Sequence, residues 1–198
     1  MEILEKLFDS KHRVKLLRLF LFNLEKAFDR TEIIRRSKVV SSALRRELAL
    51  LSAVGIIKQK KVVTVGKSGR RKVVQGWELN PDFPLTQSLR SLLNTDFLRR
   101  KTNIVKRFRN CGRIKLLVVS GVFIDDEDRR LDLLLVGDHL KKNIIEKNVR
   151  SIEAEVGREL NYATLETDEF LYRVGTSDRF IRDVFDYPHE RMIDKLTF

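Results

Sequence analysis

The stretch from Ser41 to Lys72 constrains the fold of this 198-residue chain more than any other part of the sequence. Its first half reads SSALRRELALLSAVG, and apolar residues recur there at the spacing of one face of an amphipathic helix. Ser41 is suited to cap the start of this helix, and Gly55 is suited to the positive φ that often follows a helix end. We therefore predict a helix over residues 41–54. The residues of its apolar face are Leu44, Leu48 and Leu51.

The second half of this stretch predicts a β-hairpin over residues 56–78. Two runs rich in Val and Ile flank a turn made of glycines and cations, from Gly66 to Arg71. Seven of the fifteen residues from Lys58 to Lys72 are basic and none is acidic. These cations are Lys58, Lys60, Lys61, Lys67, Arg70, Arg71 and Lys72.

A helix that exposes Ser and Arg near its N-terminus, followed by a cationic hairpin, suits a nucleic-acid duplex. The helix fits the major groove, and the hairpin tip reaches a flanking groove or the phosphates. A lysine-rich hairpin is also a common way to keep an edge strand soluble, so the hairpin alone leaves both interpretations open. Together with the helix it favours double-stranded DNA as the partner. The residues expected to contact DNA are Ser41, Ser42, Arg45, Arg46, Lys58, Lys60, Lys61, Lys67, Ser68, Arg70, Arg71 and Lys72.

The positive charge is concentrated in the N-terminal half of the chain. The formal net charge of +12 divides into +11 for residues 1–80, +5 for residues 81–110 and −4 for residues 111–198. This asymmetry predicts a basic binding module joined to a domain of another kind. The apolar runs are too short to span a bilayer, and a lone Cys111 without a signal peptide fits a cytoplasmic protein.

The residues before the stretch predict two further helices in the N-terminal module. Ser10 is the expected cap of a helix from Lys11 to about Phe22. A shorter helix is expected near Thr31 to Ser37, where Asp29 and Thr31 compete as the cap. The resulting order of helix, short helix, longer helix and hairpin is that of a winged helix-turn-helix domain.

Prolines in Asn80-Pro81-Asp82-Phe83-Pro84 end this module, and residues 81–110 are expected to form a helical connector. Its two helices are predicted over 85–93 and 96–109. Residues 111–198 then alternate apolar strands with amphipathic helices. Strands are expected over 114–120, 131–136, 161–166 and 191–196, and helices over 139–160, 167–173 and 178–185. The fold class is α+β, with a small mixed sheet in the C-terminal domain.

Two resemblances cover nearly the whole chain. Residues 1–80 resemble the winged helix-turn-helix domain of prokaryotic transcription regulators, and residues 111–198 resemble the minimal nucleotidyltransferase domain of the polymerase-β type. The segments that carry the resemblance are LFDSKHRVKLLRLFLFN, the helix of residues 41–54, NPDFP and SGVF…RRLDLLLVGD. A family of small prokaryotic regulators joins these two modules, and the resemblance implies regulation of transcription.

The nucleotidyltransferase resemblance also implies where catalytic residues would stand. Active members carry Gly-Ser after the first strand and Asp-x-Asp at the start of the second, where two carboxylates hold Mg²⁺. Here Gly121 matches the glycine and Asp132 the second carboxylate, but Val122 replaces the serine and Arg130 the first carboxylate. Glu166 is the remaining candidate for a third carboxylate. Arg130 is expected to pair with Asp132 or with an acid of the 125–128 loop.

We therefore expect an inactive nucleotidyltransferase-like domain that serves dimerisation or sensing, with no catalytic residues, metal or cofactor. The predicted function is that of a DNA-binding transcriptional regulator with double-stranded DNA and a second copy of the chain as expected partners and no membrane association. The sequence identifies no small-molecule effector. Two alternatives stay open. One is an active nucleotidyltransferase that modifies protein or RNA, and the other is an antitoxin-like partner of a toxin.

Overall fold

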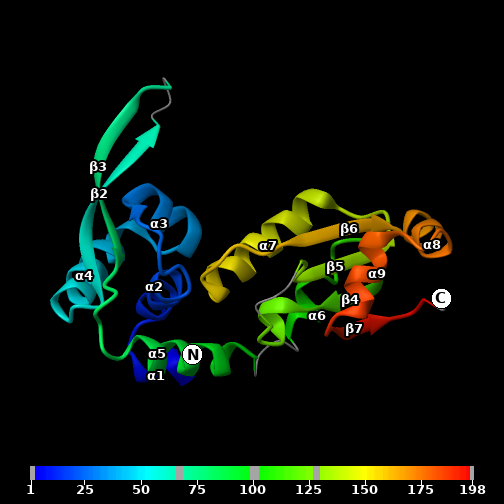
Figure 1. The fold of residues 1–198 in the computed structure, drawn as a ribbon, viewed down its shortest axis with the longest axis horizontal. Helices are drawn as coiled ribbons and strands as arrows, with labels where there is room; N and C mark the ends of the chain where they lie inside the picture. Colours follow the sequence, from blue (N-terminus) through cyan, green and yellow to red (C-terminus); the bar gives the residue numbers. More distant parts are fainter. Residues whose placement is uncertain (1–2, 66–68, 99–102, 127–129, 197–198) are drawn as a thin grey trace. The chain divides into compact units, whose positions relative to one another are not determined.

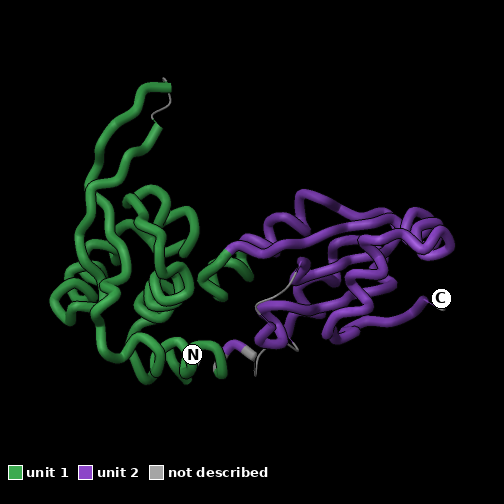
Figure 2. Tube along the Cα trace, in the orientation of Figure 1, with its two compact units in different colours: residues 1–96, 151–158 green, residues 97–150, 159–198 purple. Residues whose placement is uncertain are grey.

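The computed structural model describes residues 3–65, 69–98, 103–126 and 130–196, and it is a mixed α+β structure with two small sheets (Figure 1). The chain forms two compact units (Figure 2). Unit 1 comprises residues 1–96 and 151–158, and unit 2 comprises residues 97–150 and 159–198. None of the helices in the described ranges has the length and apolar character that a membrane span requires.

Unit 1 is built from helices and a three-stranded antiparallel sheet. The predicted helices and hairpin follow one another in the expected order, and a short first helix and a two-residue strand that were not predicted accompany them. The elements of this unit are α1 (Ile3–Leu7), α2 (Lys11–Leu21), β1 (Phe28–Asp29), α3 (Arg30–Ser37), α4 (Ser41–Ala53), β2 (Ile57–Val65), β3 (Arg71–Leu79) and α5 (Thr86–Leu98). The predicted helices and hairpin therefore lie within a few residues of their expected positions.

Side-chain caps fix the starts of α2 and α3. The Ser10 hydroxyl accepts a hydrogen bond from the Arg13 amide at 3.1 Å, and the Asp29 carboxylate accepts one from the Glu32 amide at 2.8 Å. Each cap satisfies an amide that the first helical turn leaves without a backbone partner. Asp29 is therefore the cap of α3, and the competing assignment to Thr31 is wrong.

Ser41 does not cap α4, which corrects the prediction from its sequence position. The helix begins one residue earlier than a Ser41 cap would require, so Val40 is the capping residue and makes no side-chain hydrogen bond. The Ser41 hydroxyl instead accepts a hydrogen bond from the Arg30 guanidinium at 2.9 Å. Gly55 has a φ of +84° just after the helix, as its sequence position predicted.

The sheet of unit 1 has the strand order β1-β3-β2. In the hairpin, Ile57 pairs with Leu79 and Val65 with Arg71, so all nine residues of each strand are in register. The two-residue strand β1 was not predicted, since its segment reads as a polar turn. It pairs with β3 beside Gly76, where an added Cβ would lie 2.8 Å from the Phe28 carbonyl oxygen. Because Gly76 has no Cβ, β1 can lie close enough to β3 to pair with it.

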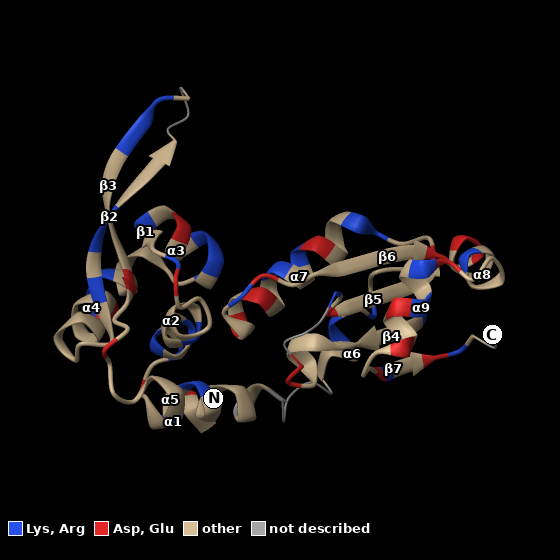
Figure 3. Cartoon of the chain, in the orientation of Figure 1, with Lys and Arg blue, Asp and Glu red and all other residues tan. Residues whose placement is uncertain are grey.

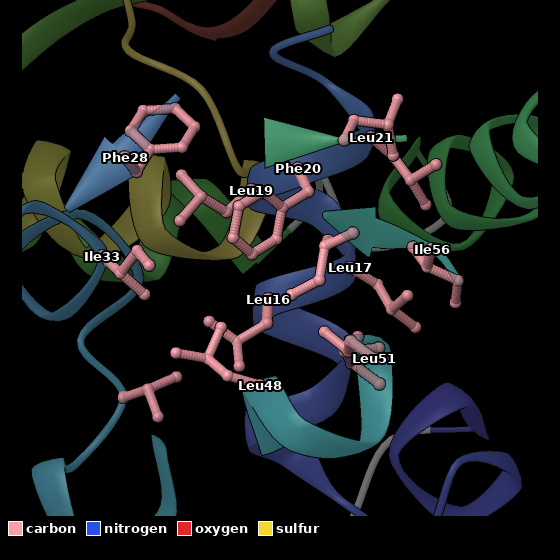
Figure 4. Close-up of a cluster of buried hydrophobic side chains, with 14 of the residues drawn as sticks. Leu16, Leu17, Leu19, Phe20, Leu21, Phe28, Ile33, Leu48, Leu51 and Ile56 are labelled. Carbon is pink, nitrogen blue, oxygen red and sulfur yellow. The ribbon is translucent and has the colours of Figure 1, made fainter. Parts of the chain in front are cut away.

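The core of unit 1 forms where α2 packs against α3, α4 and the base of the hairpin (Figure 4). Leu16, Leu17 and Phe20 of α2 are completely or almost completely buried. The predicted apolar face of α4 is confirmed, because Leu44, Leu48 and Leu51 all lie in this core. Trp77 is partly buried against the same core, in agreement with a packing role.

The predicted break between two helices near residue 94 is wrong. Helix α5 continues to Leu98, and the Thr95 hydroxyl follows the helix by donating to the Ser91 carbonyl at 2.9 Å. Leu93 is fully buried in the core of unit 1, so most of α5 packs with the N-terminal elements. The boundary between the units falls inside the segment expected to be a connector.

Residues 151–158 also belong to unit 1, although they lie far along the sequence. The Arg18 guanidinium donates to the Glu155 carbonyl at 2.8 Å, and the Asn23 amide donates to the Gly157 carbonyl at 2.6 Å. Gly157 has a φ of +86°, and a Cβ there would lie 2.4 Å from the Arg18 carbonyl carbon. This segment therefore requires glycine at 157 to reach the backbone of α2.

Unit 2 contains a four-stranded mixed sheet of strand order β6-β5-β4-β7. Strands β5 and β6 are parallel, and the other neighbouring pairs are antiparallel. Its elements are α6 (Ile104–Arg107), β4 (Arg113–Val119), the 3₁₀ turn η2 (Gly121–Phe123), β5 (Leu133–Asp138), α7 (Lys142–Val156), β6 (Tyr162–Glu166), α8 (Thr167–Gly175), α9 (Arg179–Asp186) and β7 (Glu190–Asp194). The end of α7 is counted in unit 1.

The central strands of unit 2 are the apolar runs that the sequence marked as buried. Ten of the thirteen residues of β4 and β5 are buried, because each of these strands has a neighbouring strand on both sides and helices pack against the sheet. Leu116, Leu134 and Phe170 lie in one core with apolar residues of α9. The four strands expected over 114–196 and the three helices expected over 139–185 are all present, and their ends differ from the predicted ones by a few residues.

Candidate functional site

The exposed face of α4 carries the polar residues that the sequence assigned to it. Ser42, Arg45 and Arg46 are exposed, while the leucines of the opposite face are buried. Arg46 keeps 77% of its side chain exposed even though its guanidinium lies 3.4 Å from the Glu47 carboxylate. Ser41 is exposed too, and its contact with Arg30 adds a further cation beside the start of the helix. The start of α4 therefore presents hydroxyl and guanidinium donors to the outside.

A buried carboxylate holds α4 against α2. Glu47 is completely buried, and it accepts hydrogen bonds from the Ser10 hydroxyl at 2.9 Å and from the Arg13 guanidinium at 3.0 Å. Burial raises the pKa of Glu47, but these hydrogen bonds and the Arg13 charge outweigh it and hold the pKa below its ordinary value. The helix is thus fixed by a charged contact on its buried face, since Glu47 lies three residues after Leu44 and four before Leu51.

The hairpin carries the predicted cations on strands that extend beyond the core (Figure 3). Nine residues at about 3.3 Å each give the strands a length of about 30 Å. Lys61, Arg70, Arg71 and Lys72 are exposed. No salt bridge joins these four cations to any acid in the described parts of the chain. Lys67 and Ser68 lie outside the described residues.

Two of the predicted contacts are partly neutralised within the hairpin. Lys58 and Lys60 both approach the carboxylate of Glu78 on the neighbouring strand. Sequence reasoning missed this because it considered only residues 58–72, whereas Glu78 faces Lys58 across the hairpin. These two lysines therefore carry less free charge than the cations near the tip.

The outer half of the hairpin also exposes an apolar strip. Val63 and Val73 face each other across the two strands, and Val65 follows on the same face. Their exposed fractions are 60–65%, which is high for valine. The strip lies among Lys61, Arg71 and Gln75, so the hairpin surface is mixed in character. The alternating sequence pattern places these valines on one face of the hairpin, but only the structure shows that this face is exposed.

In unit 2, Asp132 is a structural carboxylate. It is completely buried, and its two oxygens accept hydrogen bonds from the Val122 amide at 3.0 Å and from the Asn161 amide at 2.8 Å. These bonds tie the turn after β4 to the start of β6. Both oxygens that a metal ion would use are therefore engaged by backbone amides.

Arg130 lies at the surface and pairs with Asp183 of α9. The predicted pairing with Asp132 is wrong, because Asp132 is turned inward to the backbone. For the 125–128 loop, Glu127 and Asp128 lie outside the described residues. Gly121 adopts a φ of +56° at the start of the turn, as a tight turn after a strand requires.

Glu166 lies at the opposite end of the sheet from Asp132. In the parallel pair, Leu133 aligns with Tyr162 and Gly137 with Glu166, so Asp132, one residue before Leu133, lies five strand positions, roughly 16 Å, from Glu166. The Glu166 carboxylate accepts hydrogen bonds from the amides of His139 and Leu140. Within the described residues, no three His, Cys, Asp or Glu side chains converge as metal ligands would.

The two groups of candidate residues thus differ in what they can do. Those of α4 and the hairpin project cations and hydroxyl donors outward, which suits binding to a polyanion. Those around Asp132 are already engaged by hydrogen bonds and an ion pair within unit 2.

Neither a comparison with protein-family models nor one with curated proteins gave a match to this sequence.

Proposed function

We propose that the chain is a DNA-binding transcriptional regulator and that unit 1 is a winged helix-turn-helix domain. The observation that carries the proposal is that exposed cations occur both at the start of α4 and along the hairpin that follows it. The element order and the packing of α4 on α2 and α3 support the same proposal. A solvated edge strand would explain the hairpin lysines, but not the exposed guanidinium groups of α4.

In this proposal the two elements have different roles. Ser42, Arg45 and Arg46 lie in the first half of α4, which is where a recognition helix reads base edges. Arg70, Arg71 and Lys72 near the hairpin tip hold phosphates. Lys58 and Lys60, which share Glu78, contribute less to binding. The exposed valines of the hairpin become buried when the wing lies along a groove.

For unit 2 we propose a nucleotidyltransferase-like domain that does not transfer nucleotides. Its strand order and the position of the turn after β4 support the likeness. The engagement of both Asp132 oxygens by backbone amides supports the inactive assignment, since Mg²⁺ needs carboxylate oxygens that are free to bind it. We further propose a cytoplasmic homodimer, because paired half-sites give a small domain the surface needed for specific binding.

The proposal is tested by fluorescence anisotropy of the full chain on labelled DNA from a binding selection. Affinity should fall steeply with salt, because every phosphate contact releases counterions. With Lys61, Arg70, Arg71 and Lys72 of the hairpin on phosphates, the log–log slope should be about −3 to −4. A slope near zero, or no binding at low salt, would refute DNA binding. Light scattering that gives the mass of one chain, both alone and on DNA, would refute the homodimer.

A further inference from the structure

Unit 2 contains a hollow with an apolar floor and a cationic rim, remote in the sequence from the turn around Asp132. It has a volume of about 540 Å³. Its lining residues come from α6 and the following turn, from the start of β4 and from the end of β7, which are labelled in Figure 1. A volume of this size is in the range of sites for small organic ligands. Val105, Phe108, Ile114 and Ile193 supply the apolar lining.

Four cations line the same hollow, namely Arg109, Arg113, Lys115 and Lys195. Lys115 is paired with Asp138 at 3.0 Å. The other three form no salt bridge with an acid in the described ranges of the chain. The nearest strand carboxylate on β7, Asp194, is already engaged by Arg191 at 2.8 Å. The hollow therefore holds a surplus of positive charge beside apolar side chains.

Irregular strand pairing brings these cations together. The pairing of β4 with β5 skips Lys115, so this residue is the extra residue of a β-bulge. Bulges redirect a side chain and often lie beside functional sites. The Lys195 amide donates to the Lys115 carbonyl at 2.8 Å, which holds the end of the chain across the bulge. The cationic rim is thus held by backbone contacts of β4 and β7.

We propose that this hollow binds a small organic phosphate, with the phosphate on Arg109, Arg113 and Lys195 and an apolar or aromatic body against the half-buried Val105 and Ile193. Guanidinium groups bind phosphate oxygens through charge-assisted hydrogen bonds, and the apolar lining gives the body a surface to bury. A phosphate of a nucleic-acid backbone would use the cations but would leave this concave floor uncovered. The proposal does not depend on DNA binding by unit 1.

The phosphate can belong to a nucleotide or to a lipid-like ligand, and direct binding measurements distinguish the two. Isothermal titration of the full chain should use adenosine and guanosine mono- and diphosphates, decyl phosphate and inorganic phosphate. We expect one of the organic phosphates to bind at least tenfold more tightly than inorganic phosphate. Equal affinity for inorganic phosphate, or no binding of any probe at millimolar concentration, would overturn the proposal.

Two variants separate the rim from the floor. Arg109→Ala with Lys195→Ala should weaken the tightest probe by tenfold or more, because two charge-assisted contacts are lost. Ile193→Trp keeps every cation but fills the hollow, so it should abolish binding of the organic phosphate. The matched control is Lys147→Ala with Arg179→Ala, which removes the same charge from exposed positions elsewhere in unit 2 and should leave affinity unchanged.

Circular dichroism should first establish that each variant is folded. If the control weakens binding as much as the rim variant, the attraction is only net charge and the proposal fails. Unchanged binding in Ile193→Trp would show that the ligand lies elsewhere. Displacement of the bound probe by duplex DNA would assign the cations to a nucleic-acid surface and would also overturn the proposal.

Discussion

Replacing Glu47 with glutamine removes a buried negative charge from the junction between α2 and α4. The carboxylate accepts hydrogen bonds from the Ser10 hydroxyl and the Arg13 guanidinium, and glutamine keeps only one oxygen as an acceptor. A hydrogen bond to a charged group contributes about 1.5–3 kcal/mol, so we expect Glu47→Gln to lower the free energy of unfolding by about 2–4 kcal/mol at pH 7. This is a large share of the stability of an ordinary domain.

The assay is urea unfolding followed by Trp77 fluorescence. Trp77 is the single tryptophan of the chain and packs against the core of unit 1, so its signal reports on the unit that contains Glu47. With a denaturant slope of about 1–1.5 kcal/mol per molar urea, the midpoint should fall by about 2 M. The control is Glu25→Gln at an exposed position, which should change stability by less than about 0.5 kcal/mol.

The same contact determines a pH dependence. The pKa of Glu47 is lower in the folded chain than in the unfolded chain, so the unfolded state binds the proton more tightly. The contribution of Glu47 to stability is therefore present above its unfolded pKa and is lost as the pH falls through the folded pKa. Glu47→Gln should remove this acid loss between the two values.

His12 makes stability depend on pH in a range above that of Glu47. Its pKa is held below the ordinary value first by burial and then by the charges of Lys11 and Lys15. Stability is therefore lost as the pH falls from about 6.5 towards the folded pKa of His12, in both the wild type and the variant.

An unchanged urea midpoint of Glu47→Gln at pH 7 would refute the stabilising role of Glu47. A coupling energy near zero in the double-mutant cycle of Glu47→Gln with Arg13→Gln would refute it equally.

Three further predictions follow from single positions. Arg46→Ala should cost about 1–3 kcal/mol on the preferred DNA site and relax its preference, whereas Arg70→Ala should weaken all sequences alike in anisotropy competition. Asp132→Asn should destabilise unit 2 by about 1–3 kcal/mol and speed hydrogen exchange at the Val122 or Asn161 amide; unchanged exchange at both would contradict the buried-acceptor role. Gly157→Ala should lower the melting temperature through a loss of about 1–3 kcal/mol, because its φ is +86° and its Cβ would meet the Arg18 backbone. Its control is Gly175→Ala, where a Cβ would meet nothing within 4 Å.

Much of the fold could be predicted from local sequence signals. The caps Ser10 and Asp29 each act on an amide three residues away, and the leucines of α4 repeat within one helix. The apolar runs of β4 and β5 are equally local, since a strand buried on both faces needs no polar alternation. Gly55 adopts its positive φ because of the helix that ends beside it.

The features that could not be predicted depend on partners far apart in the sequence. Glu47 is separated from Ser10 by 37 residues, and Asn23 from Gly157 by 134. Strand β1 exists only because β3 lies beside it, since two residues carry no strand pattern of their own. The same holds for the candidate site, where the neutralisation of Lys58 and Lys60 by Glu78 follows from the hairpin register.

Two buried carboxylates, one in each unit, indicate which surfaces are held rigid. Glu47 lies one residue after Arg46, so the contact that fixes the backbone of α4 also fixes the point from which the exposed Arg46 side chain projects. Asp132 does the same for the turn after β4, but there it points inward and leaves no charged group to bind a ligand. A charge buried with hydrogen-bond partners costs desolvation, and it is compensated only where the geometry is well defined. By this reasoning α4 would be the preorganised part of the proposed DNA surface. Arg70, Arg71 and Lys72 of the hairpin, which form no salt bridge within the described residues, would supply adaptable phosphate contacts. Mutations of the Glu47 contact should therefore reduce DNA specificity more than nonspecific affinity.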